Sequence, residues 1–157
     1  TGALIVLERT VALGEYERTG IPIDAKVSSQ LLINIFEHNT PLHDGAIIVR
    51  GNRIISATCY LPLSDNMELS KELGTRHRAG VGISEVTDSL TIIVSEETGN
   101  VSIAQKGVLT RDVTPEELKE QLVILQDKNV STKRFKFWKG KGKNEENINQ
   151  NKENIDQ

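Results

Sequence analysis

The sequence predicts a single α/β domain with a central mixed β-sheet flanked by helices. Helical periodicities occur among strand-length apolar runs and hairpin turns, and do not follow every strand as in an alternating βαβ array. The 157 residues, 37% hydrophobic and 26% charged, are enough to bury a core. No apolar run reaches the ~18–20 residues that a membrane span needs, and one cysteine excludes an internal disulfide framework.

The first half of the chain predicts one buried strand, one helix and one hairpin. Residues 3–7 form a continuous apolar run, which is typical of a strand buried on both faces. Apolar residues recur every four positions across 24–37, with Asp24 as the expected N-cap of a helix. Residues 46–50 and 53–59 predict two strands joined by a two-residue Gly-Asn turn.

The second half predicts two further helices around another hairpin. A moderately helical stretch covers 69–79, and 90–95 with 101–105 predict two paired strands. A last helix follows, in which Thr114 is the expected N-cap and Glu117 completes a capping box.

The net charge of −3 conceals a difference between the two ends of the chain. Residues 1–128 carry 12 basic and 18 acidic side chains, a balance of −6, whereas residues 129–157 carry 7 and 4, a balance of +3. We therefore expect a folded domain over 1–128 and a tail over 129–157. Basic residues alternate with Phe and Trp at 131–142, which suits either a solvated extension or a surface for anionic lipid. Nucleic acid is disfavoured, because the acidic body would repel a phosphate backbone.

The first of three polar clusters is His43-Asp44-Gly45-Ala46, immediately before an apolar run. An Asp-Gly pair is an ordinary turn, and that interpretation stays open. In the functional interpretation, Asp44 holds a divalent cation or accepts a hydroxyl proton, and Gly45 lets a ligand approach the backbone closely. His43 would add a nitrogen ligand to the metal.

The second cluster is Gly74-Thr75-Arg76-His77-Arg78. It is either a polar helix face with ordinary ion pairs or an anion site, because guanidinium groups bind phosphate oxygens in a bidentate fork. Gly74 costs about 1 kcal/mol within a helix relative to Ala. This cost predicts that the helix begins or bends at Gly74, where backbone N–H groups would face an anion.

The third cluster is Ser95-Glu96-Glu97-Thr98-Gly99, at the end of an apolar strand. As a plain hairpin turn it has no further role. As a site it offers a hydroxyl for phosphate and one or two carboxylates for a metal ion. The three clusters together supply what metal-dependent phosphoryl or nucleotidyl transfer requires, since positioning and charge stabilisation dominate that chemistry.

In this order and separation, the D-G-A, R-H-R and S-E-E-T-G signatures resemble the catalytic domain of diadenylate cyclases, most closely the membrane-anchored bacterial type. The resemblance covers residues 2–125 and departs at Gly80, where a second alanine is expected. It implies condensation of two ATP into cyclic di-AMP and two pyrophosphates, assisted by Mg²⁺ or Mn²⁺. Each subunit of a face-to-face homodimer would hold one ATP.

The resemblance also implies a role for each matching residue. The implied catalytic residues are Asp44, Arg76, His77 and Arg78. The implied nucleotide-binding residues are Gly45, Ala46, Tyr60, Leu61, Gly74, Thr75, Arg76, Ser95 and Glu96. The implied metal ligands are His43, Asp44 and Glu97. Tyr60 is equally well explained as an ordinary half-buried strand residue, and Cys59 as part of the core.

Proteins of this type normally carry N-terminal transmembrane helices, so we expect this chain to be a soluble fragment of a protein held at the cytoplasmic face of the cell membrane. The resemblance suggests a membrane regulator protein and a phosphoglucosamine mutase as partners, and no nucleic acid. The main alternative function is a sensor module that binds a nucleotide without catalysis. An RNA-binding domain is disfavoured by the acidic body and its few aromatic residues.

Overall fold

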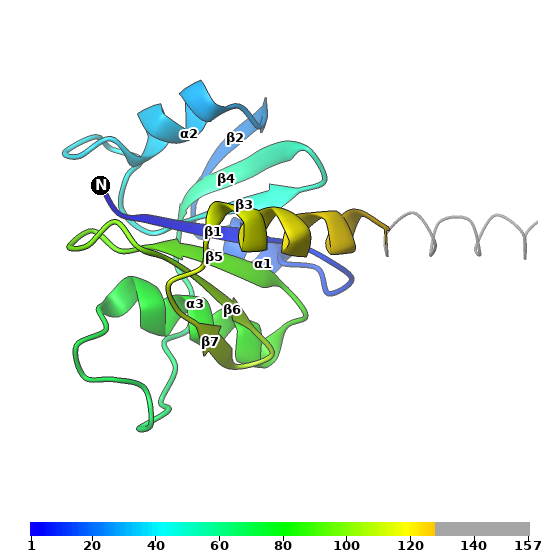
Figure 1. Ribbon diagram of the computed structural model, residues 1–157. Coiled ribbons are helices and arrows are strands. Elements are labelled where there is room, and N and C mark those ends of the chain that lie inside the picture. Colours follow the sequence, from blue (N-terminus) through cyan, green and yellow to red (C-terminus); the bar gives the residue numbers. More distant parts are fainter. Residues whose placement is uncertain (128–157) are drawn as a thin grey trace, which may run out of the picture. The chain divides into compact units, whose positions relative to one another are not determined.

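A computed structural model describes residues 1–127, and its main feature is one seven-stranded sheet (Figure 1). The strands are β1 (Ala3–Leu7), β2 (Ile21–Lys26), β3 (Ala46–Arg50), β4 (Arg53–Cys59), β5 (Leu90–Val94), β6 (Val101–Gln105) and β7 (Val108–Thr110). Their order across the sheet is β2-β4-β3-β1-β5-β6-β7. β1 and β3 run parallel, and all other neighbours are antiparallel. The sheet is therefore mixed, as the sequence predicts.

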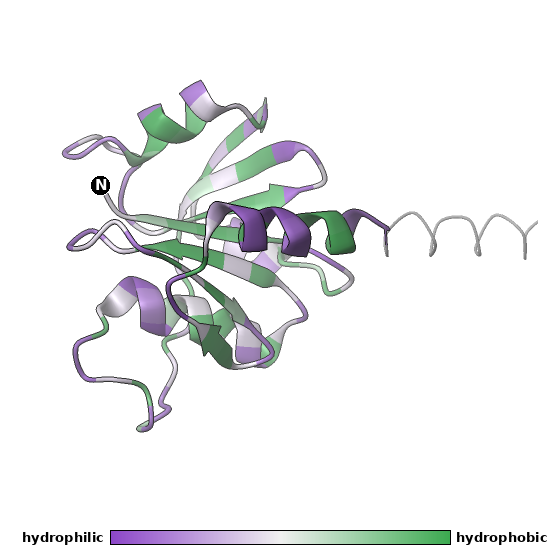
Figure 2. Ribbon diagram, in the orientation of Figure 1, coloured by the Kyte–Doolittle hydropathy of each residue, from purple (hydrophilic) through white to green (hydrophobic). Residues whose placement is uncertain are grey.

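Apolar side chains are buried on both faces of this sheet, and Figure 2 shows hydrophobic residues concentrated along its central strands. Helix α3 (Thr75–Val86) packs on one face, where Val81 and Ile83 join Leu4 and Val6 of β1. Helix α2 (Ser29–Phe36) covers the other face, where Ile35 and Phe36 are buried and Leu31 and Leu32 pack beside them. β1 is thus buried on both faces, as its unbroken apolar run predicts. Full burial of one such aliphatic side chain contributes about 1.5–3 kcal/mol to the stability of the fold.

Helix α3 begins at Thr75 with Gly74 as its N-cap, which confirms the prediction that the helix begins at Gly74. The predicted helix over 69–79 is right at 75–79, but residues 69–74 form no helix and α3 continues past the predicted end to Val86. Gly80 weakens the helical signal but allows close packing, since a Cβ there would stand 2.8 Å from Cγ1 of Ile93. Close contact with the sheet thus explains a residue that helix propensity disfavours.

The predicted helix over 24–37 is also wrong in its first part. Residues there form β2, which pairs with β4, and α2 is capped by Ser28, whose hydroxyl accepts from Leu31 N–H at 3.1 Å. Asp24 has a positive φ of 47° beside an irregularity in the pairing, and its carboxylate accepts from Arg53 Nε at 2.9 Å. An edge strand tolerates this irregularity and a proline, so strand pairing overrides the helical spacing.

The segment between β1 and β2 contains a short helix, α1 (Gly14–Glu17), that the sequence does not predict. Arg50 Nε donates to Glu8 at 2.6 Å, and Arg50 Nη2 donates to Glu17 at 2.7 Å. Arg50 thus links the end of β3 to α1, and its hydrogen bonds hold the pKa of the Glu8 carboxyl below its usual range.

A second unit begins at Thr114 and contains a helix at 115–127. Thr114 N–H donates to Glu117 Oε2 at 2.8 Å, and Glu117 N–H donates to Thr114 Oγ1 at 3.2 Å. This pair confirms the predicted capping box. No helix among residues 1–127 is both long and apolar enough to cross a membrane. The predicted boundary near Asn129 and the basic-aromatic stretch lie outside the described residues.

Candidate active site

Asp44 and Gly45 form the turn that leads into β3. Gly45 has a φ of +82°, which favours glycine, and a Cβ there would stand 3.0 Å from the carbonyl oxygen of Cys59. Gly45 N–H donates to Asp44 Oδ1 at 3.0 Å, and the Asp44 side chain is exposed. Ala46 is fully buried, which leaves neither its side chain nor its backbone at the surface. The local fold therefore requires glycine for backbone reasons and presents the Asp44 carboxylate at the surface.

A cavity of about 410 Å³, here called the Asp44 cavity, opens beside this turn. Its lining residues come from the start of β1, the turn before β3, the end of β4 with the loop after it, and the first turns of α3. They are Leu4, Pro41, Asp44, Gly45, Thr58, Cys59, Tyr60, Leu61, Leu63, Thr75, Arg76 and Ala79. The Tyr60 side chain is 75% exposed, which excludes the interpretation of Tyr60 as a half-buried strand residue.

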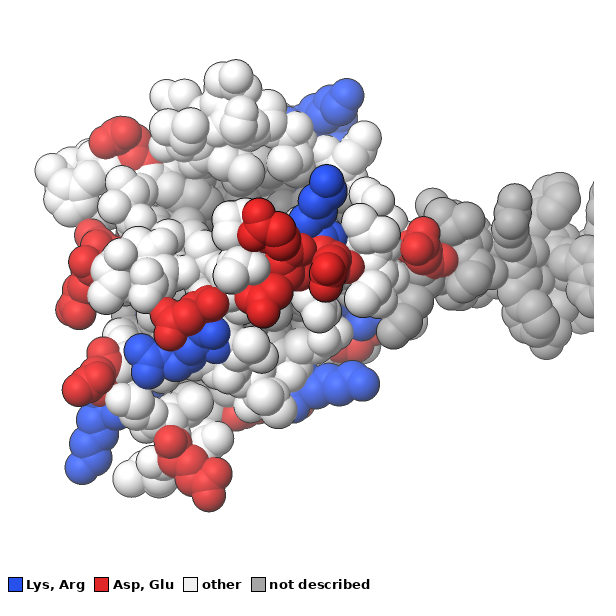
Figure 3. All heavy atoms as spheres, in the orientation of Figure 1, with Lys and Arg blue, Asp and Glu red and all other residues white. Residues whose placement is uncertain are grey.

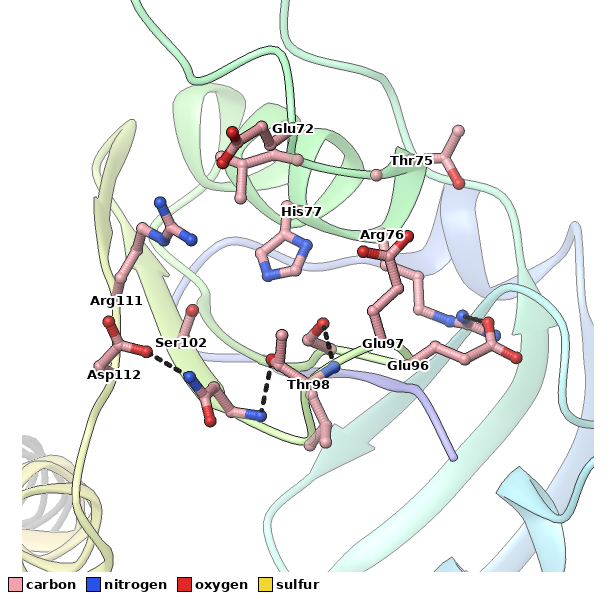
Figure 4. A pocket seen from close by; sticks show the side chains of 15 residues that line it. Glu72, Thr75, Arg76, His77, Glu96, Glu97, Thr98, Ser102, Arg111 and Asp112 are labelled. Atoms are coloured by element: carbon pink, nitrogen blue, oxygen red, sulfur yellow. Dashed lines mark hydrogen bonds and ion pairs between the residues drawn. The ribbon is translucent and has the colours of Figure 1, made fainter.

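A second cavity of about 430 Å³, here called the His77 cavity, lies between α3 and the loop that joins β5 to β6 (Figure 4). Its lining is mostly polar and charged. The residues are Glu72, Leu73, Gly74, Thr75, Arg76, His77, Val94, Ser95, Glu96, Glu97, Thr98, Asn100, Ser102, Arg111 and Asp112. Thr75 and Arg76 line both cavities. The second and third polar clusters of the sequence are therefore brought together here.

The first turn of α3 faces this shared region. Gly74 is its N-cap, in an extended conformation with no side chain to accept hydrogen bonds from the first N–H groups. A helix N-terminus of this kind is favourable for an anion, because its N–H groups and its dipole both attract negative charge. The prediction that Gly74 presents backbone donors is consistent with this geometry.

Arg76 is held between the two cavities by one ion pair. Its Nη1 donates to Glu96 Oε2 at 2.7 Å, as Figure 4 shows, and its Nε is buried without a hydrogen-bond partner among the described residues. The bond from Arg76 holds the pKa of the Glu96 carboxyl below its usual range. His38 Nδ1 lies 3.7 Å from the other oxygen of Glu96. The guanidinium thus keeps unused donors within reach of both cavities.

His77 is buried, and its ring points into the His77 cavity (Figure 4). Burial lowers the pKa of this imidazole, and the nearby Arg111 guanidinium lowers it further. His77 is therefore neutral at pH 7 and offers one N–H donor and one acceptor. Ser102 and Arg111 line the same cavity, but the sequence does not mark them, because Ser102 lies in an ordinary strand pattern and Arg111 is an isolated charge.

A family model described as "DisA bacterial checkpoint controller nucleotide-binding", abbreviated DAC, matches residues 1–109. The chain belongs to the DAC family. Cyclic di-AMP synthase CdaA of Bacillus subtilis is 62% identical over 143 residues, which cover 89% of this chain and 52% of that protein. Diadenylate cyclase of Listeria monocytogenes is 60% identical over 148 residues, 92% of this chain and 53% of that protein. The chain thus spans about half the length of these relatives.

Solved structures resemble this DAC domain equally clearly. A double mutant of DacA from Staphylococcus aureus superimposes with a TM-score of 0.78 at 53% identity, covering 79% of this chain and 83% of that one. A protein described as a hypothetical membrane spanning protein from Bacillus cereus has a TM-score of 0.69 at 47% identity, covering 72% and 55%. The expected DAC fold is thereby confirmed.

Three of the predicted site residues line neither cavity of the DAC domain: Ala46, which is fully buried, His43 and Arg78. The His43 ring is hydrogen-bonded through Nδ1 to the Thr40 carbonyl oxygen at 2.6 Å and lies 5.7 Å from the His38 ring. Arg78 is half-buried, and its carbonyl oxygen accepts from Ser64 N–H at 2.9 Å. The roles of His43, Ala46 and Arg78 therefore stay predictions from the resemblance.

The predicted metal ligands are not assembled into one group. Asp44 lines one cavity and Glu97 the other, and residues 1–127 contain no cluster of three potential ligands. Mg²⁺ usually binds through one or two carboxylates together with substrate phosphates, so exposed carboxylates of this kind still fit a nucleotide-borne cation. On the face seen in Figure 3, acidic and basic side chains of the described residues are interspersed. Phosphates would accordingly depend on local arginines and a cation.

Proposed function

We propose that this domain is a diadenylate cyclase, a metal-dependent nucleotidyltransferase that joins two ATP molecules into cyclic di-AMP and releases two pyrophosphates. The names of its relatives support this reaction. The observation that carries it is that Thr75 and Arg76 line both cavities. One ATP can therefore place its adenosine in the Asp44 cavity and its phosphates along α3 towards the His77 cavity.

In this proposal the two ends of ATP meet different groups. The adenine lies against Tyr60 and Leu61, where an exposed aromatic ring can stack on the base. The backbone at Gly45 contacts the nucleoside, whereas a contact at the buried Ala46 stays an expectation from the resemblance. The phosphates accept hydrogen bonds from side chains and backbone around the first turn of α3 and the loop after β5. These donors are Gly74, Thr75, Arg76, His77 and Ser95.

Asp44 prepares the attacking group. Its exposed carboxylate takes the proton from the ribose 3′-hydroxyl, and the resulting oxygen forms a bond to the α-phosphorus of the second ATP. The bond between that phosphorus and the bridging oxygen of pyrophosphate breaks, and pyrophosphate leaves with the electron pair. Arg76 stabilises the negative charge that develops on the phosphoryl oxygens. The same step repeated from the other nucleotide closes the ring.

A divalent metal, Mg²⁺ or Mn²⁺, would neutralise phosphate charge when bound. Asp44 and Glu97 are the carboxylates available to hold it, with His43 as the nitrogen ligand implied by the resemblance. Glu96 is a poorer ligand, because Arg76 already occupies one of its oxygens. Glu96 instead fixes the guanidinium that contacts the nucleotide.

The reaction needs a second copy of the domain, because the attacked phosphate belongs to another ATP. A face-to-face homodimer with one ATP per subunit provides this arrangement, and its two-fold symmetry matches that of the product. On the resemblance, we place the full-length protein at the cell membrane with this domain on the cytoplasmic side. We also propose a membrane regulator protein and a phosphoglucosamine mutase as its partners.

The deciding experiment incubates the protein with ATP and Mn²⁺ or Mg²⁺ at several protein concentrations, followed by chromatographic separation of the nucleotides. We expect cyclic di-AMP and pyrophosphate in a ratio of about one to two, and a rate per subunit that rises with protein concentration as dimers form. ATP binding without product at every concentration would identify a nucleotide sensor instead. Failure to bind ATP would contradict both functions.

A further inference from the structure

The guanidinium of Arg76 lies against the backbone at Gly2, immediately before β1. A Cβ placed on Gly2 would stand 2.6 Å from Nη1 and 3.0 Å from Cζ of Arg76, and 3.0 Å from Cβ of Glu96. Real Cβ atoms essentially never approach another heavy atom to 2.6 Å, so any side chain at Gly2 would occupy space that the guanidinium now fills. Gly2 is itself buried.

Few bonds hold the guanidinium in this place. One ion pair connects it to Glu96, and Nε has no partner among the described residues. Packing supplies the remaining restraint on this mostly buried side chain, and the backbone at Gly2 is part of that packing. A side chain added at Gly2 would therefore move the Arg76 guanidinium, which lines both cavities.

We propose that Gly2 is a positioning residue for Arg76, whose missing side chain lets the guanidinium cross the start of β1 and reach Glu96 between the two cavities. This inference rests on the proposed function only in the role given to Arg76. A methyl group at Gly2 pushes the guanidinium away from Glu96, and the fixed donor to the phosphates is lost.

The contact at Gly2 differs from those that serve the fold. At Gly20 and Gly82, an added Cβ would meet backbone carbonyl oxygens of Ala57 and Pro62, which cannot move without disturbing the sheet or the loop after β4. At Gly2 the two atoms of Arg76 belong to the end of a flexible side chain, and the third atom, Cβ of Glu96 at 3.0 Å, needs to give way by only a few tenths of an ångström. Alanine at Gly2 should therefore disturb the site more than the stability of the domain.

The test compares Gly2→Ala with Gly14→Ala, a control in which the added Cβ makes only an ordinary 3.5 Å contact with Arg18 outside both cavities. We expect Gly2→Ala to lower kcat/KM by about ten- to a hundredfold, as small displacements of catalytic groups do. Gly14→Ala should leave it unchanged. Both variants should keep a thermal midpoint close to that of the parent protein.

The same substitution in an Arg76→Ala background separates positioning from a general structural role. If Gly2 acts through Arg76, then Gly2→Ala has no further effect there on ATP affinity or activity. The part of any loss of thermal stability that comes from the clash with Arg76 should also disappear, and only the 3.0 Å contact with Cβ of Glu96 remains. An equal loss in both backgrounds would overturn the proposal.

A readout that needs no catalysis is the ¹⁵N–¹H resonance of Arg76 Nε, assigned by its absence in Arg76→Ala. Gly2→Ala should shift this resonance, and Gly14→Ala should not. An unshifted resonance in Gly2→Ala contradicts the proposal. If the parent protein makes no cyclic di-AMP, the cyclase function fails, while the resonance still decides whether Gly2 positions Arg76.

Discussion

The two cavities that meet at Thr75 and Arg76 are built from different kinds of residue. The Asp44 cavity is lined mainly by apolar residues, among them Leu4, Leu61 and Leu63, and contains a single carboxylate, that of Asp44. The His77 cavity gathers two arginines and four acids around a buried imidazole. Apolar walls suit a base and a sugar, whereas the two arginines suit phosphates when a cation offsets the four acids. The comparison indicates that each half of a nucleotide would be bound by a different physical effect.

The largest effect is expected in the Asp44 cavity, because its one carboxylate has no substitute. Asp44→Asn should lower kcat by about 10²–10⁴-fold, the usual range for loss of a general base. The fold should be spared, since the side chain is exposed. Asp65→Asn is the matched control, as Asp65 is exposed and lines neither cavity. Full activity in Asp44→Asn would remove its assigned role.

Tyr60 tests whether the Asp44 cavity binds the base. Tyr60→Ala should weaken the binding of ATP, ADP and AMP by a common factor of about tenfold, within the range for loss of one stacked base. Calorimetric titrations with the three nucleotides would measure this. A loss that grew with the number of phosphates would place the base elsewhere.

Arg111 tests the opposite half of the comparison. Arg111→Ala should weaken ATP binding by about three- to tenfold, since one exposed charge contributes modestly, and should leave AMP binding unchanged. Lys106→Ala, which removes one positive charge outside both cavities, is the control. Equal losses for ATP and AMP would mean that the His77 cavity does not distinguish the outer phosphates.

The smallest effect is expected for Glu8, a charged residue that stabilises the fold and lines neither cavity. Hydrogen bonds from Arg50 lower the pKa of the Glu8 carboxyl in the folded protein, so the ionised Glu8 stabilises the fold. This stabilisation is fully present above the ordinary pKa of 4.5 and is lost as the pH falls through the lowered pKa. Screening at the partly exposed Arg50 limits it to about 1 kcal/mol. Urea denaturation at pH 7 and pH 3 should show a weaker acid destabilisation in Glu8→Gln than in Glu15→Gln. Equal acid sensitivity would mean that Glu8 contributes nothing.

The sequence predicts the parts of this fold whose signals are local. The hairpin of β3 and β4 follows from its apolar runs and Gly-Asn turn, and the helix at 115–127 from its capping box. Predictions fail where distant contacts decide. The spacing over 24–37 reads as one helix, but pairing with β4 turns its first part into β2. Gly80 and Gly82 lower the helix propensity of this stretch, so the sequence underestimates the length of α3. Both positions require glycine because other elements pack closely against them.

The three polar clusters and their chemistry were determined by the sequence alone, because each is a short run of adjacent residues. Only the tertiary structure decided how these clusters meet. It divides them between two cavities joined at Thr75 and Arg76, adds Ser102 and Arg111, and leaves His43, Ala46 and Arg78 outside both. Adjacent residues on a strand or helix point in different directions. A motif therefore indicates which chemical groups are available, and the packing of the elements determines which of them line the same cavity. Gly2 lies 74 positions from Arg76 in the numbering, and no local pattern could have linked them.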